Sequence, residues 1–341
     1  MFRRRVLGLA VVAAMALAGC ASGSAQPEGS PAAGLVIYSG RSEELIGPLL
    51  EQFEAASGVV AEVRYGDTAE LAAQLLEEGD QSPADVFFAR DAGALQVIQD
   101  EGMATALPGD LVSKVPAKFR SADGQWVGTS GRARVVVYNT ESVPAGDVPD
   151  TVFELTDPQW QGQVGIAPTN ASFQAFVTAM RVAVGEDRAR QWLEGMVAND
   201  VQKFENNTGV LDAVDAGTIE VGLVNHYYWY EKAKEVGAEN MKAANAAFEA
   251  GDPGNLVNVA GVSILPTGSD NAASEQFVAF LLGDEAQQYF AEQTAEYPLV
   301  ESVDQQEGLP PLSEIDGPDL SLDQLRDLRG TQDLLMQVGL L

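Results

Sequence analysis

The chain has 341 residues, and its 50 acidic residues against 20 lysines and arginines give a formal net charge of −30. Such an acidic surface repels nucleic acid and anionic lipid, so neither is expected as a partner, and solubility or a salty habitat explains the charge most simply. The chain contains one cysteine, Cys20, and one histidine, His226. These counts exclude an intrachain disulfide and a thiolate metal site in the mature fold.

The N-terminus has the pattern of a processing segment. Arginines at 3–5 precede an apolar run at 6–17, and the run ends in Leu-Ala-Gly-Cys at 17–20, which resembles a bacterial lipobox. We therefore expect a lipoprotein signal peptide over 1–19 and lipidation of Cys20. Residues 20–33 then form the lipid anchor and a flexible tether of small polar residues. This places the protein outside the cytoplasm, held to the cell membrane through its lipid only.

The next part of the chain alternates short apolar strands with amphipathic helices. The patterns predict strands at 35–39, 59–65 and 84–89, each followed by a helix, at 43–57, 68–78 and 92–100. A βαβαβα order implies a parallel sheet. Ligands bind beyond the carboxyl ends of such strands, here at 39–42, 66–67 and 90–91.

A second α/β unit begins near residue 132. We expect strands at 135–138, 165–167 and 219–225, a helix at 173–184, a return strand at 256–265, one amphipathic helix at 275–294 and a helical end at 320–341. Two units joined by extended crossings suggest a hinged clamshell with a ligand cleft between its lobes. The predicted N-terminal lobe comprises 34–131 plus 256–299, and the C-terminal lobe 132–255 plus 300–341.

Two adjacent tyrosines, Tyr227 and Tyr228, follow the strand that ends near residue 225. A phenol has a pKa of about 10, but against a trivalent cation it becomes a phenolate and a hard oxygen ligand. The helix N-terminus would favour that negative charge. The alternative is that both rings simply pack in the core, as aromatic side chains commonly do.

Six segments in order resemble one known family. They are residues 36–41, 82–88, 130–138, 225–230, 252–254 and 296–299. The chain resembles the periplasmic ferric-ion-binding proteins of ABC importers from about residue 35 to the end. The resemblance implies a type II binding-protein clamshell, each lobe a mostly parallel sheet flanked by helices. It also implies a monomeric binding protein, not an enzyme, that captures Fe(III) and delivers it to an ABC permease.

The resemblance also implies a ligand set. The family's tyrosine pair falls on Tyr227 and Tyr228, but its accessory ligand positions hold Ser42, Arg90 and Phe173 here. A synergistic anion such as carbonate or phosphate would then supply the missing donors. Its positions map to a cradle of small and polar residues, together with an arginine: Thr169, Asn170, Ala171, Asn207, Asn225 and Arg41. A turn that opens a helix is a ready anion site.

Other residues have simpler interpretations. His226 is expected to position its neighbours more than to bind metal. Arg90 is expected to form an ordinary ion pair, either with Asp91 or with an acid across the cleft. If the protein supplies a ligand beyond those assigned, Asp91 is the first candidate. Glu43 and Glu44 stand at a helix start, where the dipole favours acids, and are not expected to be ligands.

Three other functions stay open or are disfavoured. The same fold could bind a phosphonate, thiamine or a polyamine for ABC import, although two adjacent phenols have no use in an organic-cation pocket. A sensor or scaffold lipoprotein without transport is a further alternative. Catalysis lacks support, because the chain has no phosphate loop, nucleophile elbow or zinc-protease motif.

Overall fold

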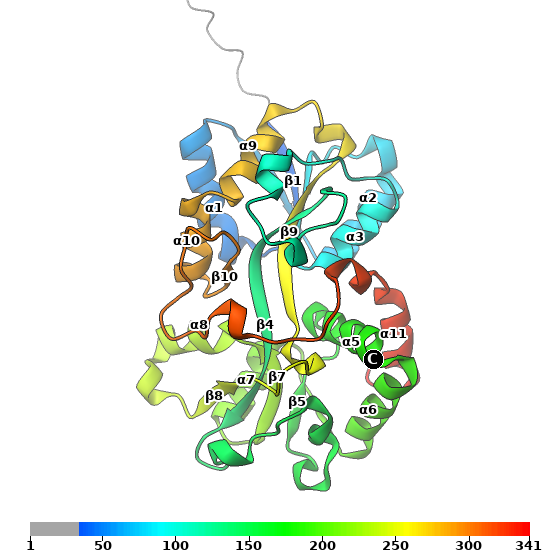
Figure 1. The fold of residues 1–341 in the computed structure, drawn as a ribbon, viewed down its shortest axis with the longest axis vertical. Coiled ribbons are helices and arrows are strands. Elements are labelled where there is room, and N and C mark those ends of the chain that lie inside the picture. Colours follow the sequence, from blue (N-terminus) through cyan, green and yellow to red (C-terminus); the bar gives the residue numbers. More distant parts are fainter. Residues whose placement is uncertain (1–33) are drawn as a thin grey trace, which may run out of the picture. The chain divides into compact units, whose positions relative to one another are not determined.

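The computed structural model describes residues 34–341, and its ribbon is drawn in Figure 1. The predicted signal peptide (1–19), Cys20 and the tether (20–33) lie outside the described residues. Within 34–341, no helix is both long and apolar enough to span a membrane.

The first three strand–helix pairs form as predicted, with small shifts at their ends. They are β1 (Leu35–Ser39), α1 (Glu43–Ser57), β2 (Ala61–Tyr65), α2 (Thr68–Glu78), β3 (Val86–Ala89) and α3 (Ala92–Asp100). β1 pairs in parallel with both β2 and β3. Asp67 and Asp91 cap the second and third helices by accepting a backbone N–H, as short polar side chains do at helix starts. These helices therefore all begin at the carboxyl edge of the sheet.

A long strand, β4 (Val127–Asn139), connects the two halves of the sheet. Residues 127–133 pair antiparallel with β9 (Val257–Ile264), and residues 134–139 pair antiparallel with β7 (Val221–Asn225) and β8 (Ala243–Ala246). The described strands form one ten-stranded sheet of order β2-β1-β3-β9-β4-β7-β5-β6, with β8 and β10 paired to β4 off this path. The α/β class is confirmed, but the sheet is mixed where mostly parallel sheets were expected, because β4 and β9 run against their neighbours.

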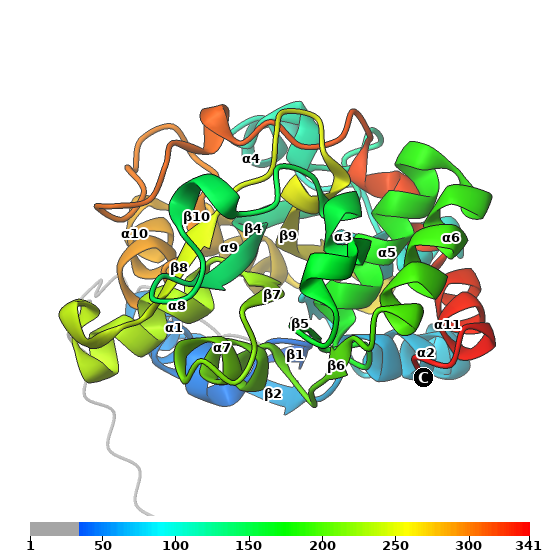
Figure 2. The same ribbon diagram turned by 90° about the horizontal axis from the view of Figure 1, so that it is seen from below.

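The second half is built around the parallel strands β5 (Val164–Ile166), β6 (Gln202–Lys203) and β7. The helices that accompany them are α5 (Ala171–Val184), α6 (Glu186–Ala198), α7 (Asn207–Asp215) and α8 (Tyr227–Val236). Figure 2 shows α5 and α6 together on one side of this half and α7 with α8 on the other. Because β5 and β7 are parallel neighbours, α5 and α8 both begin beyond the same edge of the sheet.

The C-terminal third differs from the expected elements in one place. Residues 275–294 do not form one helix: α9 (Ala272–Leu281) and α10 (Asp284–Gln293) are separated at Leu282 and Gly283, where glycine interrupts the helix. The last strand and helix of this part are β10 (Tyr297–Pro298) and α11 (Leu328–Gln337), and a 3-10 helix at Leu322–Arg326 precedes α11. The predicted helical end is thus confirmed as two short pieces. Earlier in the chain, the short helix α4 (Gly109–Val112) lies between α3 and β4.

The apolar core lies between the sheet and its helices. Phe277 of α9 packs edge-on against Phe53 of α1 and Phe88 of β3, with ring centroids 5.1 and 6.1 Å apart. The C-terminal segment joins both halves: Arg326 pairs with Asp100 at the end of α3, and Asp327 pairs with Arg181 of α5. The division of the chain into lobes at residues 131 and 255 stays a prediction, with the change of partners along β4 near residue 133 close to the first boundary.

Candidate functional site

Tyr227 and Tyr228 are the first two residues of α8, directly after β7 and His226. Their rings are stacked, with centroids 4.3 Å apart and an interplanar angle of 28°. Tyr227 is buried and Tyr228 is half-buried. Both line a cavity of about 350 Å³. The other residues that line it are Arg41, Ser42, Glu44, Leu45, Arg90, Arg132 and Glu231. Ser42 and Arg90, predicted as cleft residues, therefore share one cavity with the tyrosine pair.

The cavity holds the Tyr227 phenol in its protonated form when no cation is bound. Burial, and then the neighbouring Tyr228, raise the pKa of Tyr227 well above its ordinary value, while the Arg132 charge opposes this rise. A phenol in this state is a poor ligand until a strongly charged cation displaces its proton. The site is thus suited to a cation of high charge.

A buried charge network supports one wall of this cavity. Glu296 accepts two hydrogen bonds from the Arg41 guanidinium, at 2.9 and 2.8 Å, and one from the Ser130 hydroxyl at 2.8 Å. The Arg132 guanidinium lies 3.8 Å from the same carboxylate. Burial alone would raise the pKa of Glu296, but the two arginines hold it below its ordinary value.

Arg41 and Arg132 differ in how many of their guanidinium N–H groups are hydrogen-bonded. The two terminal nitrogens of Arg41 are both bonded to Glu296. The Arg132 guanidinium makes no side-chain hydrogen bond within residues 34–341, although it is only 3% exposed. Buried polar groups are normally hydrogen-bonded. Arg132 therefore offers unused donors to an anion in the cavity.

The predicted anion cradle lies around Ser172, at the start of α5. Asn170 caps this helix and accepts hydrogen bonds from the Ser172 backbone at 3.0 Å and from its hydroxyl at 2.6 Å. The Asn207 amide and the Arg134 guanidinium donate to the same hydroxyl, at 3.1 and 3.2 Å. The Ser172 hydroxyl thus already occupies the centre of the predicted cradle.

The other predicted cradle residues lie close by but face other neighbours. Asn225 ends β7 and pairs with Arg134 in the β4–β7 ladder. Thr169 and Ala171 line a separate cavity of about 140 Å³, which also contains Asp67 and Asp91. Cradle residues and tyrosine pair therefore do not line the same cavity.

His226 and Asp91 also lie outside the tyrosine cavity. The His226 ring is buried, with Nδ1 3.1 Å from the Ala133 backbone nitrogen and Nε2 2.8 Å from the Ala295 carbonyl oxygen. Burial lowers the pKa of His226 to about 4, so the ring is neutral and both nitrogens are engaged. The His226 ring packs edge-on against the Tyr227 ring, with centroids 5.9 Å apart. This contact positions Tyr227, as expected from the sequence. Asp91 is occupied in capping α3 through the Ala94 backbone N–H at 3.0 Å.

Two carboxylates in the tyrosine cavity were not predicted. Glu231 lies four residues after Tyr227, and Glu44 lies at the start of α1. The spacing of Glu231 was the available signal, because residues i and i+4 share one face of a helix. Within residues 34–341, no cluster of three or more His, Cys, Asp or Glu side chains could hold a metal.

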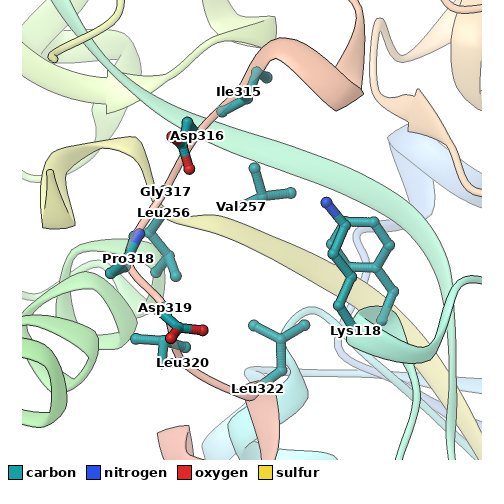
Figure 3. A pocket seen from close by; sticks show the side chains of 11 residues that line it. Lys118, Leu256, Val257, Ile315, Asp316, Gly317, Pro318, Asp319, Leu320 and Leu322 are labelled. Carbon is teal, nitrogen blue, oxygen red and sulfur yellow. The ribbon is translucent and has the colours of Figure 1, made fainter. Parts of the chain in front are cut away.

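A second cavity, of about 400 Å³, lies against β9 and the segment at 315–322 (Figure 3). Figure 3 shows Lys118 across from Asp316 and Asp319, with Val257 between them. It contains no phenol and no arginine. Of these two cavities, the tyrosine cavity is therefore the one that matches the ligand chemistry expected from the sequence.

The fold and this cavity define a binding protein for a small solute, and comparison with known proteins agrees. Residues 81–317 match the family described as bacterial extracellular solute-binding protein, and the chain belongs to that family. It is 31% identical over 310 residues to the major ferric iron-binding protein of Neisseria meningitidis serogroup B, covering 90% of this chain and 93% of that protein.

Solved structures give the same result. Iron-bound HitA from Pseudomonas aeruginosa superposes with a TM-score of 0.84 at 31% identity, covering 89% of this chain and 99% of that one. Trichodesmium FutA in complex with iron and citrate gives 0.79 at 26% identity, covering 91% and 100%. The predicted resemblance to ferric-ion-binding proteins and the type II binding-protein fold are confirmed.

Proposed function

We propose that this protein captures Fe(III) in the tyrosine cavity and delivers it to the permease of an ABC importer. The stacked pair of Tyr227 and Tyr228 at a strand-to-helix junction, in a cavity lined by arginines, carries the proposal. The names of the relatives support it, because the Neisseria protein is called ferric iron-binding and HitA was solved with iron. Binding and release without chemical conversion make the protein a carrier and not an enzyme.

The proposed capture is a proton–metal exchange at two phenols. Fe(III) displaces both protons, and the phenolates bind it as hard oxygen ligands. Nearby Arg132 opposes the rise in the Tyr227 pKa, so it eases the loss of that proton. Binding releases protons to solvent, and acid therefore favours release of iron.

An oxyanion such as carbonate or phosphate is proposed to complete the metal's coordination. Arg132 supports this best, because its buried guanidinium lines the cavity with unused donors. Arg41 lines the same cavity, but its terminal nitrogens are bonded to Glu296. The cradle of Thr169, Asn170, Ala171, Asn207 and Asn225 stays a proposal for a second, adjoining anion position.

The test is titration of the purified protein with ferric citrate, followed by the phenolate-to-iron charge-transfer band. Tyr227→Phe and Tyr228→Phe should each remove most of the visible absorbance and weaken binding by orders of magnitude. Tyr230→Phe is the matched control, since this phenol belongs to the same helix but donates to the Gly308 carbonyl outside the cavity. Wild-type titrations of both cavity mutants would refute the proposal.

The anion is tested separately. Affinity in buffer free of carbonate and phosphate should rise when either anion is restored, and Arg132→Gln should remove that dependence. Affinity that is indifferent to every added anion would show that the protein itself completes the coordination.

One alternative ligand is favoured by a specific observation. Arg41, Arg90 and Arg132 all line the cavity, which suits a phosphonate and opposes the cations thiamine and polyamine. Calorimetry with a small alkylphosphonate and no iron distinguishes this case. Tight binding of the phosphonate, together with no visible band from ferric citrate, would favour it over iron.

The remaining parts of the proposal concern placement in the cell. We infer a monomer tethered outside the cytoplasmic membrane by the lipid on Cys20, with the lobe boundaries predicted from the sequence. Transport also separates this proposal from a sensor or scaffold lipoprotein, because only transport requires that iron uptake by cells depend on the protein.

A further inference from the structure

We propose that Glu231 is a third protein ligand of the bound Fe(III), beside Tyr227 and Tyr228. This inference rests on the proposed function. It concerns a carboxylate that lies in the cavity but has no assigned role in the ligand set implied by the family resemblance.

The helix α8 places the three side chains on neighbouring positions of one face. Glu231 follows Tyr228 by three residues and Tyr227 by four, the two spacings at which helical side chains are neighbours. A long side chain in a helix points back over the turn N-terminal to its own Cα. The Glu231 carboxylate is therefore directed toward the turn that carries both tyrosines, and all three residues line the same cavity.

The Glu231 carboxylate is not committed to another partner. It forms no hydrogen bond and no ion pair within residues 34–341, although it is half-buried. The next residue, Lys232, pairs with Asp212 at 2.6 Å. Arg41 lines the same cavity as Glu231, but its terminal nitrogens are bonded to Glu296. A carboxylate in this state is available to a cation.

The other side of the cavity offers poorer donors. Ser42 supplies a neutral hydroxyl, and Arg90 supplies a cation, which cannot bind metal. Glu44 is the competing carboxylate, but it is exposed at the start of α1. Glu231 shares one helix with the tyrosines, so the spacing of their backbone positions does not depend on the rest of the cavity. A hard trivalent cation prefers such a prearranged set of oxygens.

The experiment compares five full-length proteins, purified with their folding checked by circular dichroism: wild type, Glu231→Gln, Glu231→Asp, Glu44→Gln and Glu235→Gln. Glu235 is the matched control, one turn further along the same helix and exposed. Each is titrated with ferric citrate, and the position and intensity of the charge-transfer band are recorded. Glu231→Gln should keep a band, because both phenolates remain, but the band should shift.

Loss of a direct ligand should weaken binding of Fe(III) at least as much as loss of a supporting residue, by about tenfold or more. Glu231→Asp, which keeps the carboxylate, should recover part of the affinity. Glu235→Gln should match wild type in affinity and in band position, and any effect of Glu44→Gln should be smaller than that of Glu231→Gln.

The outcomes separate the two claims. A wild-type protein without a band refutes the proposed function itself. A wild-type band together with an unshifted band and unchanged affinity in Glu231→Gln overturns only the role of Glu231. A loss of affinity without any shift would also overturn it as a ligand, and an effect confined to Glu44→Gln would assign the third carboxylate to Glu44 instead.

Discussion

Glu296→Gln is expected to destabilise the protein strongly. The glutamate is fully buried between Arg41 and Arg132. It accepts two hydrogen bonds from Arg41, one from Ser130 and one from Thr294. Glutamine preserves the shape but removes the charge, which leaves Arg41 and Arg132 buried without a counter-charge. Breaking a buried pair in this way typically costs about 3–5 kcal/mol. For a unit of this size the same loss lowers Tm by roughly 5–15 °C.

The assay is urea unfolding at neutral pH, compared with Glu44→Gln, which removes an exposed charge near the same cavity. The exposed substitution should change the free energy of unfolding by less than about 1 kcal/mol. The refuting result is a loss below about 1 kcal/mol for Glu296→Gln itself. That result would mean that Arg41 and Arg132 do not depend on this carboxylate in the folded state.

The pH dependence gives a second check on the same residue. The folded-state pKa of Glu296 lies below its ordinary value, so its contribution to stability is present above the unfolded pKa and is lost as pH falls through the folded one. The stability difference between wild type and Glu296→Gln should therefore be largest near neutrality and should shrink in acid. A difference that grew with acidification would contradict the ion-pair assignment.

Three further predictions concern titration, release and anchoring. His226 is the only histidine, so its single set of imidazole NMR resonances should titrate with a midpoint near 4; a midpoint near 6.5 would show an exposed ring. Because the unfolded ring takes up its proton at higher pH, wild type should lose up to ~3 kcal/mol of stability between pH 6.5 and 4 relative to His226→Gln, measured by urea unfolding. Mild acid should discharge iron from Tyr227 and Tyr228 while the fold persists, so visible absorbance should vanish before far-UV circular dichroism does; simultaneous loss would mean that release is unfolding. Cys20→Ser should move the protein from the membrane fraction to the soluble fraction of cells, and a mutant that stays membrane-bound would contradict lipidation.

The local elements could be predicted because their signals are local. Leucine and phenylalanine spacing marked α1 and α2, and Asp67 and Asp91 stand where N-capping residues are expected. The tyrosine pair could be located because it follows an apolar strand that ends at residue 225. Each of these depends on residues within about one helical turn of one another.

The features that sequence reasoning missed depend on distant residues. Glu296 and Arg41 are separated by 255 residues, so no local sequence pattern predicts their ion pair. The N-terminal part of β4, at 127–134, reads Val-Gly-Thr-Ser-Gly-Arg-Ala-Arg and lacks the apolar run of a buried strand. To predict that Glu231 lines the cavity, one must know which face of α8 is turned toward it. That is decided by packing against the other half of the sheet.

The strand order constrains how the chain can acquire its structure. β9 is inserted between β3 and β4, although it comes more than a hundred residues after β4 in the sequence. During synthesis, β3 and the first half of β4 are exposed strand edges until β9 has been made and can pair with both. Distant pairing of this kind slows folding and leaves unpaired edges open to aggregation. Truncation before residue 257 should therefore yield an insoluble product and not a smaller folded domain, because the central partner of both strands would be missing.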